Sequence, residues 1–220
     1  MGKVKVLAFA GKLSMSLGVG VLLFVAWTLW GTGIYTERTQ SRLNEVFVSQ
    51  PKFPPRGSNS QEPRRPPRDY RPPPGDPVFR LRIPAIDLSQ IVVEGVGTEE
   101  LKGGPGHYPA CGAGFPRPFC TRLDEVWPGE RGRVIVSGHR TTYGAPFWAL
   151  NELERGDDII TETKWGTFSY RVSGSEIVPP TATDIANPRA TDGREIVLTT
   201  CNPRFSAAER LIVFARLEEA

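Results

Sequence analysis

The part of the sequence that is able to fold lacks an excess of positive charge. Residues 78–220 contain 16 Lys and Arg against 19 Asp and Glu, although the whole chain of 220 residues has a formal net charge of +3. Binding to nucleic acid through phosphate neutralisation therefore loses its main support. There is no internal repeat, and the 23 glycines and 21 prolines are too many for a helical bundle and not periodic enough for collagen.

Histidine and cysteine are also scarce, with two and three residues respectively. The cysteines are Cys111, Cys120 and Cys201. In an exported protein, three cysteines indicate one disulfide and one free thiol. A free thiol in such a protein suggests a functional role for that cysteine. A zinc site that includes His107 is not expected, because the number and spacing of the ligands are poor.

Residues 13–36 form a run of 24 residues without a charge. A helix of this length covers about 36 Å, enough to cross a hydrocarbon core of about 30 Å with some tilt. Lysines lie before the run and aromatic residues near its far end, namely Lys3, Lys5, Lys12, Trp27, Trp30 and Tyr35. This pattern predicts a membrane anchor with residues 1–12 in the cytoplasm. A cleaved signal peptide is the alternative, but the run is long for one and lacks a convincing cleavage site.

Residues 37–77 are predicted to link the anchor to the folded unit outside the membrane. Residues 37–50 could continue as a short helix or stalk. Residues 51–77 contain ten prolines, and proline lacks an amide donor, so we expect an extended, partly polyproline-II spacer. Its maximal reach would be on the order of 80 Å. A ligand for a proline-binding domain is the alternative interpretation of this segment.

Residues 78–220 consist of short β-type runs separated by turns. Seven runs are expected to form strands: 78–83, 90–96, 132–138, 157–163, 167–178, 195–201 and 210–217. Helix signals are brief and occur around 98–102, 146–153 and 183–186. Seven or eight strands with few helices in a compact chain predict a mainly β fold, a closed or nearly closed barrel.

Three residues at the ends of predicted strands could perform chemistry together. Cys201 ends one apolar run and His139 follows another. If the two strands end at the same rim of the barrel, the thiol lies close to an imidazole that can take its proton. Arg210 starts the next strand, nine residues after Cys201, where a hairpin would return it to the same rim. Its guanidinium can stabilise an oxyanion but cannot act as a base. Each residue taken alone also has an ordinary interpretation. Cys201 could be a buried, inert cysteine, His139 a surface histidine and Arg210 a charged residue at a strand edge.

These motifs resemble the signatures of the sortase family, and of its class E in particular. The matching segments are SGHRTTYG (137–144), VLTTC (197–201), NPRFSAAERLIV (202–213) and GPGHYP (104–109). They occur in the family's order and cover most of residues 78–220. The resemblance implies an eight-stranded β-barrel transpeptidase outside the membrane, anchored in the bilayer by a single span.

The resemblance also implies roles for residues and partners. Cys201 would be the nucleophile, His139 the general acid and base, and Arg210 the stabiliser of substrate and oxyanion. Substrates would be exported proteins with a C-terminal LPXTG or LAXTG sorting motif, cut between Thr and Gly. The thioester would pass to an amine of a peptidoglycan precursor. No metal or organic cofactor is required.

Residues 110–130 depart from the class E pattern as a longer, proline-rich insertion. We predict a Cys111–Cys120 disulfide within it, because a short loop closes easily in an oxidising compartment; two free thiols are the alternative. The predicted substrate-binding residues are Thr200, Thr141, Tyr143 and Tyr108. Ordinary loop packing is the alternative for them, and His107 is expected to be structural rather than a second base.

Three other functions compete with a housekeeping sortase. A pilin-polymerising sortase usually has a second, C-terminal membrane segment, which is not expected after residues 217–220. An L,D-transpeptidase also uses Cys and His, but in an S-x-G-C context that residues 198–201 lack. An anchored, non-catalytic barrel that binds peptides would require Cys201, His139 and Arg210 to lie apart in space.

Overall fold

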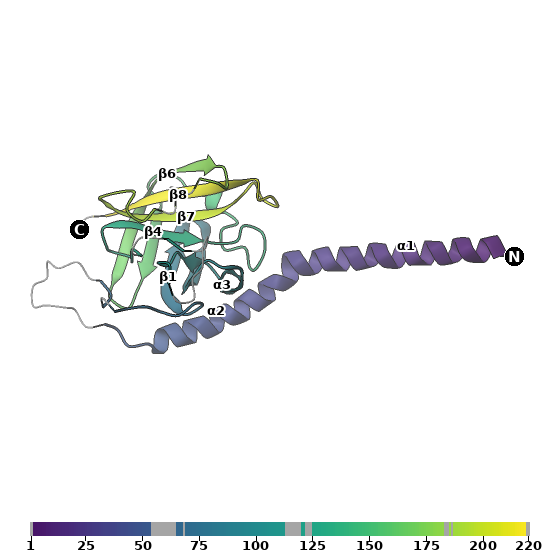
Figure 1. Cartoon of the computed structure of the whole chain (residues 1–220), viewed down its shortest axis with the longest axis horizontal. Helices are drawn as coiled ribbons and strands as arrows, with labels where there is room; N and C mark the ends of the chain where they lie inside the picture. The colour runs from purple at the N-terminus through teal and green to yellow at the C-terminus, as the bar shows by residue number, and fades with distance from the viewer. Residues whose placement is uncertain are drawn as a thin grey trace, which may run out of the picture.

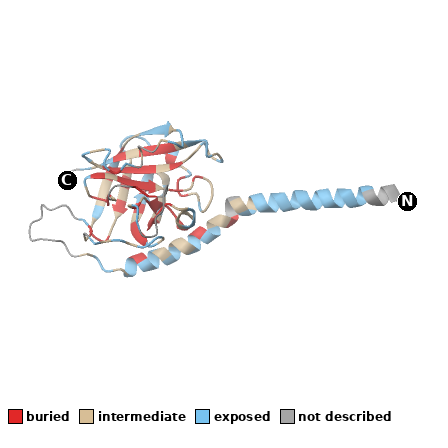
Figure 2. Ribbon diagram, viewed as in Figure 1, coloured by how far each residue is buried: buried red, intermediate tan, exposed pale blue. Residues whose placement is uncertain are grey.

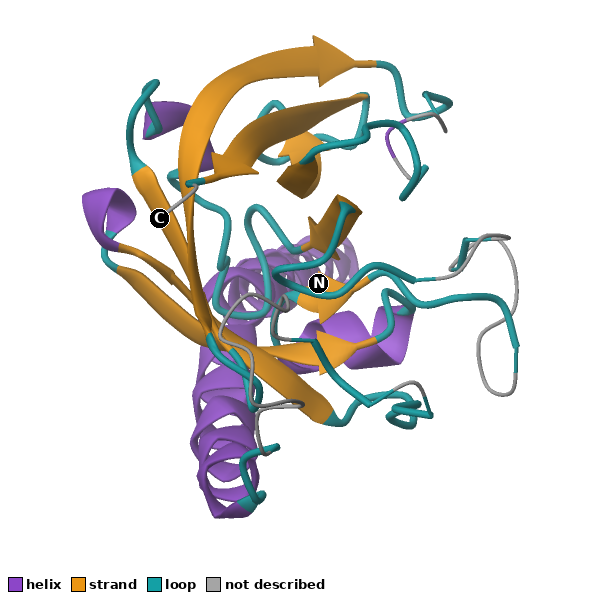
Figure 3. Cartoon of the chain, turned by 90° about the vertical axis from the view of Figure 1, so that its left-hand side faces the viewer, coloured by secondary structure: helices purple, strands orange, loops and turns teal. Residues whose placement is uncertain are grey.

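The computed structural model describes residues 2–53, 65–67, 69–112, 120–121, 125–182, 185 and 187–218. Within these ranges eight strands close into a barrel in the order β1-β2-β3-β4-β7-β8-β6-β5. They are β1 (Pro77–Ile83), β2 (Leu88–Glu94), β3 (Gly106–His107), β4 (Gly132–Ser137), β5 (Asp158–Glu162), β6 (Thr167–Val178), β7 (Arg194–Asn202) and β8 (Glu209–Leu217). Figure 3 shows the strands from the end of the barrel opposite the N-terminal helix. The expected eight-stranded, mainly β barrel is confirmed.

The predicted secondary structure agrees with most of these elements. All seven predicted strands are present, but β3 was missed, because two residues are too short to show a period-2 pattern. The expected helix at 98–102 is α3 (Thr98–Gly103). At 146–153 there is only a turn followed by the 3-10 helix η3 (Leu150–Glu152), so the prediction of a helix over all of 146–153 was wrong. The expected helix at 183–186 falls largely outside the described residues.

The strands β4 and β7 lie side by side and are parallel, with Ser137 opposite Thr199 at their carboxyl ends. Both carry continuous buried runs, Val134–Val136 and Ile196–Leu198, as expected for parallel strands that are covered on both faces. Because they run in the same direction, the loops that follow them leave from the same rim of the barrel. The candidate site described below lies at this rim.

The N-terminal helices reach this same end of the barrel. Helix α1 (Gly2–Ala26) is followed by the π-helical segment η1 (Trp27–Gly31) and by α2 (Thr32–Ser49), and the chain bends at η1 (Figure 1). In α1, residues 7–26 are long and apolar enough to cross a membrane. Figure 2 shows residues 7–25 of α1 exposed, whereas α2 has buried positions on the side that faces the barrel.

Helix α2 packs along the outside of the barrel against β1, β2 and α3. The side chain of Gln40 donates to the carbonyls of Ile91 and Gly103 and accepts from the amide of Ile91, and Thr36 is 1% exposed. Residues 32–36, the last part of the predicted 13–36 span, therefore contact protein. An uncharged run does not distinguish a helix that faces lipid from one that packs against a domain.

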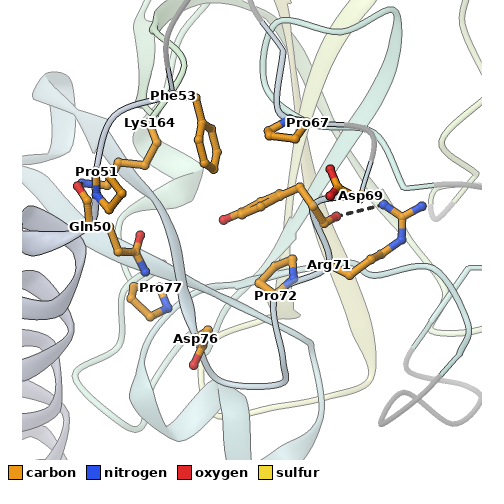
Figure 4. Close-up of a pocket in the computed structure, with 11 residues that line it drawn as sticks. Gln50, Pro51, Phe53, Pro67, Asp69, Arg71, Pro72, Asp76, Pro77 and Lys164 are labelled. Carbon is orange, nitrogen blue, oxygen red and sulfur yellow. Dashed lines mark hydrogen bonds between the residues drawn. The ribbon is translucent and has the colours of Figure 1, made fainter.

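The described parts of the proline-rich segment also lie on the barrel instead of extending away as a spacer. The ring of Tyr70 packs edge-on against Phe53, Trp127 and Trp165, at centroid distances of 5.0 to 5.8 Å. A cavity of about 330 Å³ lies between this segment and the barrel, bordered by residues that include Phe53, Pro67 and Lys164 (Figure 4). Aromatic burial holds the segment in place, which composition alone did not indicate.

A buried ion pair lies inside the barrel, on the two strands next to this aromatic cluster. The Nδ1 atom of His107 is 2.8 Å from Oε2 of Glu94, its Nε2 donates to the carbonyl of Val126, and the ring stacks on Trp127. Burial alone would lower the pKa of His107, but the charge and hydrogen bond of Glu94 together raise it. Burial raises the pKa of Glu94 against the opposing attraction of His107. His107 is thus a structural residue, with both ring nitrogens bonded.

This pair predicts that stability falls as pH rises. Both groups bind protons more tightly in the folded chain than in the unfolded chain, where their pKa values are near 4.5 and 6.5. The folded state therefore holds more protons between those values and the raised ones, and the free energy of unfolding should fall across that window by on the order of 1 kcal/mol. Urea unfolding of the detergent-solubilised chain at a series of pH values measures it.

The matched variants for this prediction are Glu94→Gln and Glu99→Gln. Without the carboxylate of Glu94, buried His107 has no ionic partner and should resist protonation, so the slope should vanish or reverse. Glu99 is an exposed carboxylate on α3, and its variant should keep the slope of the unmodified chain. An unchanged slope in Glu94→Gln would show that the pair does not control the pH dependence.

Candidate active site

Strand register brings the three predicted catalytic residues into one row. Cys201 on β7 lies directly opposite Arg210 on β8 in the antiparallel pairing. On the other side of β7, the parallel pairing ends with Ser137 opposite Thr199, and the amide of Gly138 still donates to the carbonyl of Thr199. His139 follows at once, so it leaves β4 at the level of Cys201. Residues that are far apart in sequence therefore meet across three adjacent strands.

A cavity of about 240 Å³ opens at this point of the barrel rim. Its lining residues come from β4, β7, β8 and the region around α3: Val96, Leu101, Tyr108, Ser137, Gly138, His139, Thr199, Thr200, Cys201 and Arg210. Cys201 is partly exposed and is the one free thiol among the described residues. A thiol fixed by a strand yet open to a cavity is suited to act as a nucleophile.

His139 has an unusual environment for an imidazole. Its Nε2 atom is buried and has no hydrogen-bond partner among the described residues, and its ring lies 5.0 Å from that of Tyr143, centroid to centroid. Burial lowers the pKa of His139, which favours the neutral ring, the form that can accept a proton. A buried nitrogen without a partner costs free energy, which is explained if a substrate or the thiol engages it during reaction.

The guanidinium of Arg210 is only partly engaged. Its Nη1 group donates to the carbonyls of Ala207 and Glu209, at 3.0 and 2.9 Å. Arginine has five N–H donors, and within the described part of the chain the other nitrogens of Arg210 make no hydrogen bond. Donors that project from a fixed strand at the edge of the cavity can bind a carbonyl or an oxyanion.

Arg140 is a residue of the site that the sequence interpretation missed. It is 4% exposed, and its Nη1 donates to the carbonyl of Cys201 at 3.2 Å. Its Nε and Nη2 donate to the carbonyl of Trp148 and to Oδ1 of Asn151. Arg140 thereby ties the backbone of the cysteine to the turn after the histidine. Its place directly after His139 was the available signal, but only the fold shows that the side chain turns inward.

The four predicted substrate-binding residues occupy different environments. Tyr108 and Thr200 line the cavity, and burial raises the pKa of Tyr108. Thr200 is 3% exposed and donates to the carbonyl of Gly138 at 2.7 Å, so its hydroxyl holds β7 to the end of β4. Thr199, which was not among the predicted residues, lines the cavity as well.

Thr141 and Tyr143 lie outside the lining of that cavity, on the loop after His139. The backbone of Tyr143 and of the next two residues has positive φ, at 51°, 72° and 44°, a conformation that non-glycine residues rarely adopt. The amide of Tyr143 donates to Oγ1 of Thr32, and the side chain of Thr36 packs against Gly144. The start of α2 therefore supports the loop that carries the histidine, a contact between distant segments that no local motif indicated.

The proline-rich insertion contains the disulfide between Cys111 and Cys120. Residues 113–119 and 122–124 of this insertion fall outside the described ranges. Among the described residues there is no group of three or more His, Cys, Asp and Glu side chains that could hold a metal ion.

Larger cavities lie elsewhere, such as the one of about 540 Å³ bordered by Arg131 and Arg194 at the starts of β4 and β7. The small cavity is the candidate site because the thiol and the imidazole border it.

Comparison with known proteins agrees with this geometry. The family model described as a sortase domain matches residues 81–218, which is more than half of the chain. The chain therefore belongs to the sortase family, whose members are generally cysteine transpeptidases and generally anchored in membranes. The resemblance to class E sortases that the motifs indicated is also shown by individual relatives.

Two relatives from Streptomyces coelicolor and Streptomyces avermitilis illustrate the similarity. Sortase SrtE1 of S. coelicolor is 29% identical over 95% of this chain, which spans only 56% of the length of that protein. The crystal structure of sortase E1 from the same organism, with a tripeptide in its active site, has a TM-score of 0.57 and 30% identity, covering 67% of this chain and 91% of that one. Sortase E of S. avermitilis has a TM-score of 0.53 and 31% identity over 66% of this chain and 90% of its own.

The role of Arg140 leads to a stability prediction. Arg140→Lys keeps the charge but cannot reach the three separate acceptors, so it should lower the free energy of unfolding by about 2 kcal/mol. Arg204→Lys is the matched control, because Arg204 bonds the same Trp148 carbonyl from a more exposed position and should cost less than about 1 kcal/mol. Urea unfolding measures both, and equal losses would contradict the assigned role of Arg140.

Proposed function

We propose that this chain is a membrane-anchored cysteine transpeptidase that cuts a C-terminal sorting motif of the LPXTG or LAXTG type between Thr and Gly. The observation that carries the proposal is the row formed by His139, Cys201 and Arg210 around one cavity. The alternative of a non-catalytic peptide-binding barrel required these residues to lie apart. Their convergence favours catalysis.

In the first half-reaction Cys201 would be acylated. Neutral His139 takes the thiol proton as Sγ attacks the Thr carbonyl carbon, which gives a tetrahedral oxyanion. The intermediate collapses, the Thr–Gly C–N bond breaks, and His139 returns the proton to the leaving Gly amine. A thioester remains on Cys201. The Nε2 atom of His139 has no hydrogen-bond partner within the described part of the chain, which supports this role because this atom would exchange the proton.

In the second half-reaction an amine of a peptidoglycan precursor would attack the thioester carbonyl. It forms a new C–N bond, gives its proton to His139, and the proton ends on the departing Cys201 sulfur. Arg210 would stabilise the oxyanion in both halves through the guanidinium donors that remain free of the Ala207 and Glu209 carbonyls. No metal or organic cofactor takes part.

Substrate contacts are proposed for the residues that the sequence indicated. Tyr108 and Thr200 border the cavity and would contact the sorting peptide or shape the wall behind it. Thr141 and Tyr143 lie on the adjacent loop, where the Tyr143 ring is placed to hold His139 in orientation. The insertion stapled by Cys111 and Cys120 would influence which motif is preferred.

The chain is proposed to span the membrane once, with residues 1–12 in the cytoplasm and the barrel outside. Residues 7–26 have the length and hydropathy for a span, and lysines at positions 3, 5 and 12 favour a cytoplasmic N-terminus. Its partners would be exported proteins with a sorting signal, the precursor amine and the lipid bilayer.

A ligation assay tests the proposed activity. The full chain is incubated with LPXTG and LAXTG peptides and an amine acceptor, and mass spectrometry follows the acyl-enzyme and the ligated product. We expect both species for the unmodified chain, neither for Cys201→Ala, and a loss of about 100-fold or more in rate for Arg210→Ala, as for the removal of an oxyanion donor.

The double variant Cys111→Ala/Cys120→Ala is the control for general damage to the fold. Loss of this disulfide should lower the free energy of unfolding by about 2 kcal/mol while acylation of Cys201 persists. A folded, unmodified chain that forms neither acyl-enzyme nor product would refute the proposed activity. Equal loss of turnover in folded Cys201→Ala and in the double variant would refute the division of roles.

The proposed topology predicts a specific pattern of protease protection. In right-side-out vesicles, external protease should digest the barrel and leave a short membrane-protected fragment that contains residues 1–26. In inverted vesicles the barrel should be protected and a tag placed before residue 1 should be removed. The reverse pattern would show that the N-terminus lies outside.

A further inference from the structure

The end of the barrel that carries the active site is also the end at which the membrane helix arrives. The Tyr143 amide donates to Thr32 at the start of α2, and Thr36 donates to the carbonyl of Lys102 at the end of α3. Both contacts lie next to the cavity of Cys201. In Figure 1, α1 leaves the barrel on the side toward which β4 and β7 point.

Exposed apolar side chains gather at this same end. Phe205, in the loop between β7 and β8, is 67% exposed, and Trp148 is 40% exposed. Their rings are in edge-on contact at 5.8 Å, and the guanidinium of Arg204 lies 4.3 Å from the Trp148 ring centroid. At the start of α2, Ile34 and Tyr35 are 53% and 54% exposed.

Phe205 is costly to the folded chain in two ways. Its φ is +66°, which a bulky residue rarely adopts and which favours Gly or Asn. Its ring is also largely in contact with solvent, where an aromatic side chain gains nothing from burial. A strained and exposed aromatic residue beside an active site points to a contact with something outside the barrel.

We propose that Phe205 and Trp148 insert into the interfacial region of the lipid bilayer and, with α1, hold the active-site rim against the membrane surface. Aromatic rings, and tryptophan in particular, favour this region because one part of it is apolar and the other hydrated. Arg204 is already paired with Glu152, so contact through the rings, rather than through net positive charge, is the expected mode. The inference rests on the proposed membrane anchor.

This orientation has a consequence for the substrates. A sorting motif that enters from the membrane side would meet Cys201 close to the bilayer surface, without first moving away from it. Only η1 (Trp27–Gly31) separates α1 from α2, which packs on the barrel, so the path from the span to the barrel is short. The proposed contact would therefore deliver membrane-bound substrates to the cavity in a fixed orientation.

Spin labelling in lipid tests the contact without using enzymatic activity. In a Cys201→Ala background the remaining cysteines are disulfide-bonded, so Ala207→Cys places a single nitroxide on the β7–β8 loop. Asp192→Cys places the control label just before β7, at the opposite end of the barrel. The full chain is reconstituted in POPC vesicles at low protein-to-lipid ratio, and power saturation measures collisions with oxygen and with a water-soluble nickel complex.

We expect the label at 207 to collide with the nickel complex several-fold less often than the label at 192. Adding Phe205→Asn, which suits the left-handed backbone but removes the ring, should restore collisions at 207 toward the value at 192. Val48→Ser is the matched control, because Val48 is 66% exposed near the far end of α2 and its loss should change nothing at 207.

Three results would overturn the proposal. The label at 207 could be as accessible to nickel as the label at 192, or Phe205→Asn could leave its protection unchanged. Protection that grows with the protein-to-lipid ratio would assign the aromatic pair to contact between two copies of the chain. Protease protection of residues 1–26 in the same vesicles separates these results from failure of the anchor itself.

Discussion

The register of three neighbouring strands determines where the candidate active site lies. Parallel pairing of β4 with β7 places the residues after Ser137 beside Cys201, and antiparallel pairing of β7 with β8 places Arg210 on its other side. Backbone hydrogen bonds of the sheet therefore set the positions of the thiol, the imidazole and the guanidinium, independently of any contact among these three side chains. A shift of one residue would move one member of the row to the other face of the sheet.

Buried polar side chains hold the ends of these strands in place. Arg140 joins the carbonyl of Cys201 to the turn at Trp148, and Thr200 joins β7 to the carbonyl of Gly138. Each of them bonds a backbone carbonyl that lies beyond the last pair of β4 with β7, Ser137 with Thr199. By contrast, Nε2 of His139 has no hydrogen-bond partner among the residues that the structure describes, and it is the proposed proton acceptor.

The N-terminal region supports the loop of the candidate site and also carries the helix that is long and apolar enough to cross a membrane. Helix α2 packs on the barrel through Gln40 and supports the His139 loop through Thr32, and the aromatic ring of Tyr70 fixes the following segment to the barrel surface. In the proposed orientation the membrane, α2 and the active-site rim form one continuous structure. The anchor would then influence the position of the catalytic loop as well as the location of the domain.

The class of fold, the seven longer strands and the likeness to sortases could be predicted from the sequence, because apolar runs, turns and the motifs around His139 and Cys201 are local patterns. The sequence also indicated the cysteine pair and the apolar helix. The two-residue strand β3, the inward turn of Arg140, the contact of Thr32 with Tyr143 and the packing of Tyr70 were decided by the tertiary structure alone. Each depends on partners far away in the chain, and the free energy that selects them comes from burial and hydrogen bonding that exist only once the barrel has closed.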